Sequence, residues 1–536
     1  MQAQPPRQKG FVLSKLNTKM KNKEIQISRW DLYSLITIGF FLIFQLLRWR
    51  ILPQFMDMYY HLQTAWGFLQ AGGYSGWDFW QYAPAGRTHI YPPLFHIILA
   101  ILLKLGINKI ILAKLVEIAA PTAFLFTIWY FIKHNFGRRL AFFVLITLSA
   151  STSFYLSLFN NIPATLGIIF GITAINAFLH NKPIRSVLLL AACFYSHIGI
   201  SYMFLCTILL LGLMNKRYFK LTALICLSAL IMSCPIILKQ IQTAATVSLS
   251  GIAERYFCEF KTLEYLFAII GIWVILRGKR QYLIFICFFL ASFVLIMYPY
   301  RFFSAQGYLS IGLLAAVAID FIYEKLNPGS IFTHLVPIIL VIYFLVFSPT
   351  IIMHKDNLND KTSLRFFIFD TAAVNVVLPN LDRRIASQSL WFPADYLHIS
   401  EIIQDNSNQQ DIIYSDNQIA GLALASVSGR PTANALLPEI KPSRDFNPLL
   451  SSKIIVLTKN EDMNEQNTIA ASLNLKKLGE SGMFVAYNNP SCITRNDFKP
   501  SRLKFWLIYL IIAVIAIIAL FGDRITQKIL VKRAKK

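Results

Sequence analysis

Four polar, aromatic-rich pieces follow the first long apolar segment and organise this chain: MDMYYH (56–61), GWDFW (76–80), PAGR (84–87) and YPPL (91–94). Asp57 and His61 are four residues apart, so in a helix both side chains project from one face. A carboxylate held at a membrane boundary, with Arg87 a short loop away, can accept a proton beside an anionic substrate. The structural alternative is an amphipathic interfacial helix whose aromatic rings lie at the level of the lipid headgroups.

The composition is that of a polytopic membrane protein. Of 536 residues, 56% are hydrophobic and only 15% are charged, and the mean hydropathy is +0.53. The net charge of +24 comes from Lys and Arg residues that cluster between apolar runs and at both ends, as the positive-inside rule predicts. No nucleic-acid-binding motif accompanies them, which excludes nucleic acid as a partner. Seven cysteines, mostly within apolar runs, form neither a disulfide framework nor a metal-ligand spacing.

The apolar runs predict about twelve membrane crossings with both termini in the cytoplasm of a plasma-membrane protein. The piece Pro93–Leu105 is apolar but short, and it either crosses or is re-entrant or interfacial. The second reading keeps the basic loops on one side, so we adopt it. The predicted spans are Leu32–Leu47, Ile110–Ile132, Leu140–Leu158, Pro163–Leu179, Ile184–Tyr195, Ile198–Met214, Phe219–Leu238, Leu263–Leu276, Tyr282–Tyr298, Phe302–Ile322, Ile331–Ile352 and Leu503–Phe521.

The predicted domains follow from these spans: a basic cytoplasmic tail (1–31), a transmembrane domain (32–352) with a first outer loop (52–109), an extracytoplasmic domain (353–502), a last transmembrane helix (503–521) and a second basic tail (522–536). The segment 353–502 is rich in Asp, Asn, Gln and Ser, and its apolar runs have strand length. Strands are expected at 411–415, 453–457 and 482–487, and helices at 396–404, 419–426 and 465–473. These elements predict a small α/β domain.

Few charged groups lie close to the apolar runs, where they are costly unless they face a cavity or the water boundary. Arg301 stands at the rim of a span in the aromatic stretch Tyr298–Phe303. Its planar guanidinium matches phosphate oxygens, although a snorkelling interfacial anchor is an equal alternative. Asp57 is the strongest acidic candidate for a divalent cation, so dependence on Mg²⁺ or Mn²⁺ stays open. His197 could be a ligand, but a single histidine at a membrane rim is more often a hydrogen-bonding residue.

Several of these stretches resemble the GT-C membrane glycosyltransferases, and most of all relatives of the oligosaccharyltransferase catalytic subunit. The segment 57–62 (DMYYHL) is similar to that family's Asp-x-(Trp/Tyr)-(Tyr/Phe)-His-Leu segment, and 82–93 is similar to its YPxGR…YPxL stretch. Arg301-Phe302 matches the position of the arginine that contacts the lipid-linked phosphate.

The resemblance implies an inverting glycosyltransferase that takes a sugar or glycan from a polyprenyl-phosphate-linked donor to an acceptor on the outer face of the membrane. Asp57 would be the catalytic base, and Arg301 and Arg87 would bind the donor phosphate. Membrane lipids are the expected surroundings, and the acceptor, whether glycan, lipid or protein, is not specified. The residues expected to bind substrate are His61, Asp78, His89, Tyr91, Asn160, Asn161 and Glu254.

The chain departs from the family pattern at two places. The second acidic motif reads Asn160-Asn161, and the acceptor motif WWDYG is absent, its nearest counterpart being YSDNQ at 414–418. Peptide glycosylation and metal dependence therefore stay open. Two alternatives also remain: a non-catalytic relative that binds a lipid-linked glycan, and a polysaccharide ligase or transporter. No internal symmetry of the kind found in many transporters is present.

Overall fold

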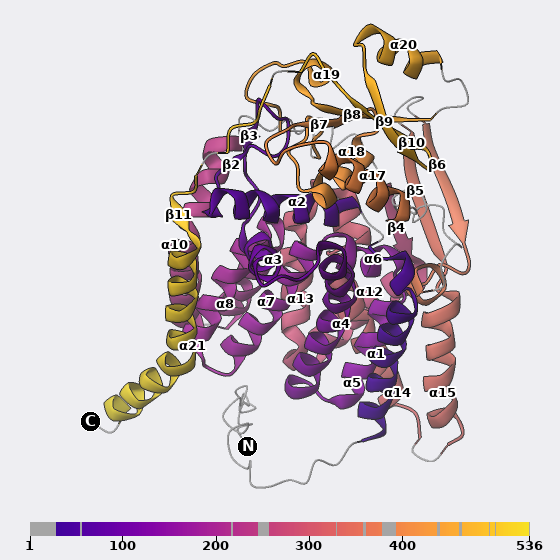
Figure 1. Cartoon of the computed structure of the whole chain (residues 1–536). Coiled ribbons are helices and arrows are strands. Elements are labelled where there is room, and N and C mark those ends of the chain that lie inside the picture. The colour runs from indigo at the N-terminus through magenta and orange to yellow at the C-terminus, as the bar shows by residue number, and fades with distance from the viewer. Residues whose placement is uncertain are drawn as a thin grey trace, which may run out of the picture.

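A helical bundle carries a mixed α/β layer at one end in the computed structural model (Figure 1). The structure describes residues 28–53, 56–215, 218–244, 257–327, 330–356, 361–377, 393–436, 440–459, 464–492, 494–498 and 500–534. The helices of the bundle are α1 (Arg29–Leu47), α3 (Leu94–Lys104), α4 (Lys109–Asn135), α5 (Arg138–Ser149), α6 (Thr152–Asn160), α7 (Ile162–Leu179), α8 (Pro183–Ser196), α9 (Ile198–Met214), α10 (Phe219–Thr243), α12 (Thr262–Arg277), α13 (Leu283–Ser292), α14 (Tyr308–Glu324), α15 (Phe332–Ile342) and α21 (Phe505–Ala534). Short helical turns are η2 (Trp49–Ile51), η5 (Arg280–Tyr282), η6 (Phe293–Leu295), η7 (Tyr300–Ser304), η8 (Tyr343–Phe347) and η9 (Ala373–Val377).

The bundle is that of a multi-pass membrane protein. Among the described residues, six helical segments are long and apolar enough to cross a bilayer, or seven if the bent pair α5 and α6 forms one span. Shorter apolar helices such as α8 and α9 accompany them. Helix α3 has 11 residues, about 16 Å at 1.5 Å per residue, which is too short for a hydrocarbon core of about 30 Å. The total of about twelve crossings stays a prediction.

Two predicted spans differ from the structure. The expected single helix 140–158 is broken into α5 and α6, which meet at 87°, because the Ser151 side chain accepts a hydrogen bond from the Phe154 N–H and starts a new helix. The expected span 331–352 ends earlier. Helix α15 passes into the π-helical turn η8, and Pro349 precedes strand β5 (Thr350–Asp356); a proline supplies no N–H with which to continue a helix.

Ion pairs join the ends of several helices at one end of the bundle. Asp31 in the first turn of α1 forms an ion pair with Lys133 (2.9 Å) at the end of α4. Glu324 at the end of α14 pairs with Lys279 (2.6 Å) and with Arg139 (3.4 Å). These contacts place the ends of α1, α4 and α14 together, opposite to the end that carries the α/β layer in Figure 1.

The α/β layer contains the elements expected from the sequence. Its sheet has the order β7-β8-β10-β9, in which β7 and β8 are parallel and the other neighbours antiparallel. Strand β9 was not expected, because none of its residues is buried and most of them are polar. The strands are β7 (Ile413–Ser415), β8 (Ile454–Thr458), β9 (Lys476–Ser481) and β10 (Phe484–Asn488), and the helices α17 (Pro393–Asp405), α18 (Gln418–Ser428), α19 (Pro448–Ser451) and α20 (Asn464–Ser472).

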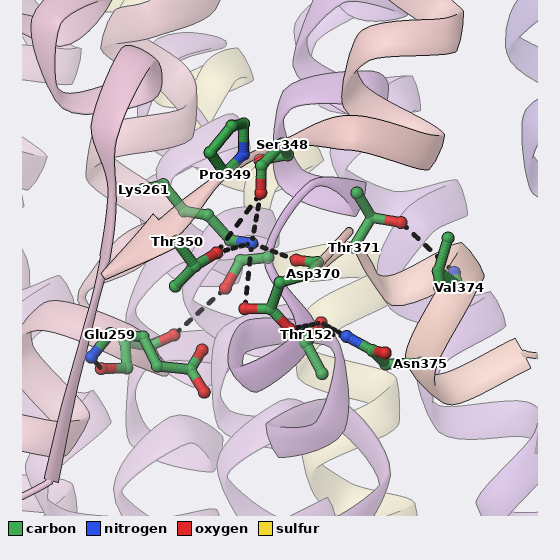
Figure 2. A network of polar contacts seen from close by, with 12 residues as sticks. Thr152, Glu259, Lys261, Ser348, Pro349, Thr350, Asp370, Thr371, Val374 and Asn375 are labelled. Atoms are coloured by element: carbon green, nitrogen blue, oxygen red, sulfur yellow. Dashed lines mark hydrogen bonds and ion pairs between the residues drawn. The ribbon is translucent and has the colours of Figure 1, made fainter. Parts of the chain in front are cut away.

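A second sheet packs against the bundle and contains residues on both sides of the expected boundary at residue 353. Strand β5 begins at Thr350 and pairs with β4 (Phe257–Lys261) and β6 (Lys361–Phe367). At its base the Lys261 ammonium and the Asp370 carboxylate, each 1% exposed, lie 3.4 Å apart (Figure 2). Asp370 also accepts from Thr152 at the start of α6 (3.1 Å). This buried pair therefore fixes the sheet to the break between α5 and α6.

The first outer loop lies between the bundle and the α/β layer. Helix α2 (Met56–Ala71) packs against α3 on one side and α18 on the other. Beyond it, the strand pair β2 (Trp77–Asp78) and β3 (Arg87–Thr88) turns at Gly86, whose φ of +66° and whose contact with Trp77 exclude a Cβ. Strand β1 (Gly73–Tyr74) pairs with β11 (Leu503–Lys504) at the start of α21. The loop is thus held on both sides along its length.

Candidate functional site

Asp57 lies in the first turn of α2, where the amide dipoles of a helix favour a negative charge. Met58 and Leu62, which follow it, are buried in the cluster that contains α3, and Tyr59 packs against the α/β layer. This packing fixes the start of the helix. The Asp57 side chain is half-buried. Burial raises the pKa of its carboxyl to about 6, and the nearby Arg301 guanidinium opposes that shift. A carboxylate with this pKa is suited to accepting a proton near neutral pH.

Arg301 comes to the same place from the π-helical turn η7. This turn fits closely against the start of α14, because a Cβ on Gly307 would lie 2.1 Å from the Phe302 carbonyl oxygen. Its far end is held by Ser304, whose hydroxyl accepts from the Glu259 N–H (2.7 Å), beside the network of Figure 2. The Arg301 guanidinium lies 5.5 Å from the centre of the Tyr298 ring. The backbone of η7 therefore fixes where the Arg301 side chain begins.

His197 is the third polar group of this cluster. It lies between α8 and α9 and is 7% exposed. Its Nε2 is 3.2 Å from Nη1 of Arg301, and its ring stands edge-on to Tyr91 at 6.5 Å. We call Asp57, His197 and Arg301 the site triad.

Tyr91 links the members of the site triad. Burial raises the pKa of its phenol, and both Arg301 and Asp57 act on it electrostatically. The His61 ring packs against the Tyr91 ring, with the ring centres 5.6 Å apart. The Nδ1 of His61 is 2.9 Å from Nε2 of His96, and burial lowers the pKa of His61 to about 3, so the imidazole is neutral. His61 thus supports the wall of the site, and His96 is a partner that the sequence did not single out.

Asp78, Arg87 and His89, which we call the loop triad, form a separate and fully buried group. The Asp78 carboxylate is 3.3 Å from Nε of Arg87 and 2.6 Å from Nδ1 of His89. Burial alone would raise the pKa of Asp78, but His89 and Arg87 outweigh it and hold the pKa below its usual value. Arg87 also donates to Gln81 (2.6 Å) and to the Ile440 carbonyl (3.2 Å).

The expected phosphate-binding role of Arg87 is therefore corrected. Its side chain is 1% exposed, and its donors are directed at protein acceptors. Strand pairing sets this arrangement, because β2 and β3 place Asp78 directly opposite Arg87. Asp78 and His89 likewise lie within the protein, and Arg87, which Asp78 pairs with, joins the first outer loop to Ile440 of the segment 353–502.

Asn160 and Asn161 lie at the junction of α6 and α7, and α6 packs against α2. The Oδ1 of Asn161 is buried and has no hydrogen-bond partner, so a polar atom remains to be satisfied at this junction. Glu254 lies outside the described residues.

The comparisons with known proteins report on the fold. Three solved structures illustrate the match. The first is the Archaeoglobus fulgidus oligosaccharyltransferase in complex with Zn and sulfate, with a TM-score of 0.54, 11% identity, and coverage of 85% of this chain and 73% of that one. The second is A. fulgidus AglB in complex with an inhibitory peptide and a dolichol-phosphate, with a TM-score of 0.51, 11% identity, and coverage of 86% and 75%. The third is Cupriavidus metallidurans ArnT bound to undecaprenyl phosphate, with a TM-score of 0.51, 13% identity, and coverage of 86% and 98%.

This chain has the fold of a GT-C glycosyltransferase. The resemblance inferred from the first outer loop is confirmed at the level of the fold. No protein-family model and no curated protein sequence matches the chain. At such low identity the likeness fixes the architecture, and the chemistry has to be argued from this chain's own residues.

A metal centre finds little support on this GT-C scaffold. Among the described residues, no group of three or more His, Cys, Asp or Glu side chains is arranged to hold an ion. Helix α2, which carries Asp57, packs against α6, and α6 ends in Asn160 rather than in a carboxylate that would supply charge for a cation. We therefore derive no step through a metal.

One signal for His197 could be read from the sequence. Its position between two apolar runs placed it at the outer rim, but its function as the N-cap of α9 depends on where that helix begins.

Proposed function

We propose that this protein is an inverting glycosyltransferase that takes its sugar from a polyprenyl-phosphate-linked donor on the outer face of the plasma membrane. The observation that carries the proposal is that Arg301 lies close enough to Asp57 to act on it electrostatically, although these groups of opposite charge come from distant parts of the chain. Asp57 is the base for the acceptor, and Arg301 binds the phosphate of the donor. Both termini then lie in the cytoplasm.

The chemistry is a single displacement. Asp57 takes the proton of the acceptor nucleophile, which forms a bond to the anomeric carbon of the sugar while the bond from that carbon to the phosphate oxygen breaks. The bonding electrons stay on the polyprenyl phosphate, and Arg301 offsets the charge that develops there. Because the nucleophile and the leaving group lie on opposite faces of the sugar, the anomeric configuration inverts.

An apolar cavity supports a lipid-linked donor. It measures about 330 Å³ and lies beside η7, between α12, α13 and α14. Phe302 and Phe303, the two residues after Arg301, line it, together with Ile269 and Phe293, which are also exposed on the outer surface of the bundle. A hydrocarbon chain in this cavity would have its phosphate next to Arg301.

The test uses the purified full chain with radiolabelled sugars linked to undecaprenyl phosphate, and a membrane extract as the source of acceptors. We expect release of undecaprenyl phosphate and transfer of label, and parallel reactions with EDTA, Mg²⁺ or Mn²⁺ measure any metal requirement. Donor binding without release under every condition would contradict catalysis.

That outcome would favour a second function, a non-catalytic protein that binds a lipid-linked glycan. The specific observation behind it is that Asn160 and Asn161 stand at the junction where the GT-C resemblance predicts carboxylates. An active transferase would be distinguished by turnover that depends on Asp57.

A further inference from the structure

Burial and the nearby Arg301 guanidinium hold the pKa of His197 well below its usual value, so the imidazole is neutral. A neutral imidazole accepts a hydrogen bond at only one nitrogen, and the contacts of His197 indicate which one. The Ile200 N–H in the first turn of α9 donates to Nδ1 of His197 at 3.4 Å. An imidazole nitrogen that accepts carries no hydrogen, so in the neutral ring the hydrogen is on Nε2. Nε2 is then a hydrogen-bond donor.

Nε2 faces another donor, Nη1 of Arg301, at 3.2 Å. A guanidinium has five N–H donors and no acceptor, so these two groups cannot satisfy each other. The opposite tautomer would let Nε2 accept from Arg301, but it would turn an N–H toward the N–H of Ile200 and remove the cap of α9. The arrangement that keeps the cap leaves two donors 3.2 Å apart, close enough to share one acceptor.

An anionic oxygen satisfies both donors at once. We propose that His197 donates Nε2–H to the phosphate group of the lipid-linked donor, beside Arg301, as a second phosphate-binding residue. This inference rests on the proposed function, which supplies the phosphate. The 17-residue helix α9 begins at Ile198, so its amino end adds a favourable potential for an anion next to His197.

The alternative is a positioning residue that accepts from Arg301 and only orients it. The two roles predict different combined effects of substitutions at His197 and Arg301 on phosphate binding. If His197 contacts the phosphate, removing its donor weakens binding whether or not Arg301 is present. If His197 acts only through Arg301, removing it has no effect once Arg301 is gone.

The experiment measures the dissociation constant of undecaprenyl phosphate for the purified full chain in one detergent. His197→Asn keeps a side chain that caps helices well but supplies no donor at the position of Nε2. We expect affinity to fall about 10- to 100-fold, the range for a hydrogen bond to a charged group. The fall should be of similar size in the Arg301→Ala background, and His197→Gln, whose amide reaches farther, should recover part of it.

Three results would overturn the inference. Equal affinity of His197→Asn and the wild type, with melting temperatures matched, would remove His197 from phosphate binding. A loss in the wild-type background that vanishes in Arg301→Ala would make His197 a positioning residue. Inorganic phosphate bound as tightly as undecaprenyl phosphate would assign the site to free phosphate. The matched control is His180→Asn, because His180 is exposed and its Nδ1 contacts the Asn176 carbonyl within its own helical segment.

The proposed function fails in a different way. A wild-type protein that binds no undecaprenyl phosphate would contradict the lipid-linked donor itself. A wild type that binds it, and variants of His197 that bind it equally well, would contradict the role of His197 alone.

Discussion

The site triad and the loop triad contain the same residue types, an aspartate, an arginine and a histidine, in opposite environments. In the loop triad every side chain is at most 2% exposed, and the carboxylate contacts both the arginine and the histidine. In the site triad the carboxylate is half-buried, and the arginine and the histidine approach each other instead of sharing an acceptor.

The two aspartates respond accordingly. The pKa of Asp78 is held below its usual value, so its ionised form stabilises the folded protein. The pKa of Asp57 is raised to about 6, so its ionised form costs stability at neutral pH. The carboxylate that is paired with an arginine holds the structure together, and the carboxylate whose pKa lies near neutrality can exchange a proton with a substrate. Residue type alone does not distinguish the two.

The largest expected effect is on the rate of transfer. Asp57→Asn removes the proposed base and should lower the turnover of the labelled donor by about 10²–10⁴-fold, the usual contribution of a positioned base. Affinity for undecaprenyl phosphate should persist. The melting temperature at pH 7.5 should not fall, because the raised pKa shows that the folded state disfavours the charged form. Near-normal turnover would exclude Asp57 as the base.

The second-largest expected effect is a loss of folding stability when the loop triad is broken. Arg87→Met leaves the buried Asp78 carboxylate without its guanidinium partner, and breaking such a pair costs about 3–5 kcal/mol of the free energy of unfolding. The measurement is the thermal unfolding midpoint in detergent, together with the amount of folded protein recovered. Transfer per folded molecule should remain. The control is Arg50→Met at an exposed arginine, and an equal midpoint in both variants would contradict a structural role for Arg87.

Patterns within a short segment predicted local structure well. The runs 411–415, 453–457 and 482–487 became strands β7, β8 and β10, because buried strands need apolar residues in sequence. The GT-C resemblance of the first outer loop also agrees with the fold. Hydropathy missed the break at Ser151, since averaging over an apolar run hides one capping hydroxyl.

Contacts between distant segments could not be read in the same way. Arg87 lies in a motif that resembles the family's. Only the pairing of β2 with β3 reveals that its charge is paired with Asp78 inside the protein. The approach of Arg301 to Asp57 and His197 depends on how η7, α2 and α9 pack together. Burial and pairing decide the role of such residues, and both arise from the tertiary structure.

The third-largest expected effect is the loss of donor affinity in variants of Arg301. Arg301→Ala should weaken undecaprenyl phosphate binding by about 1.5–3 kcal/mol, the contribution of a charge-assisted hydrogen bond. Arg301→Lys keeps the charge but loses the planar fork, so recovery should be partial. Arg277→Ala, at an exposed arginine that lies over Trp273, is the matched control. Full recovery by lysine, with a change of stability in the alanine variant, would assign Arg301 to membrane anchoring.

The smallest expected effect is the pH dependence of transfer. Asp57 accepts a proton only when ionised, so the rate should fall about tenfold per pH unit below a midpoint near pH 6 and stay constant above it. Arg301 lowers the pKa of Asp57, so Arg301→Ala should move this midpoint upward. Because the lipid-linked sugar is a phosphodiester, it lacks the ionisation near pH 6 that a phosphate monoester has, and single-turnover rates with it report on the protein. A midpoint near 4 in the wild type would mean that Asp57 is solvated like an ordinary surface carboxylate, and the contrast with the loop triad would then no longer hold.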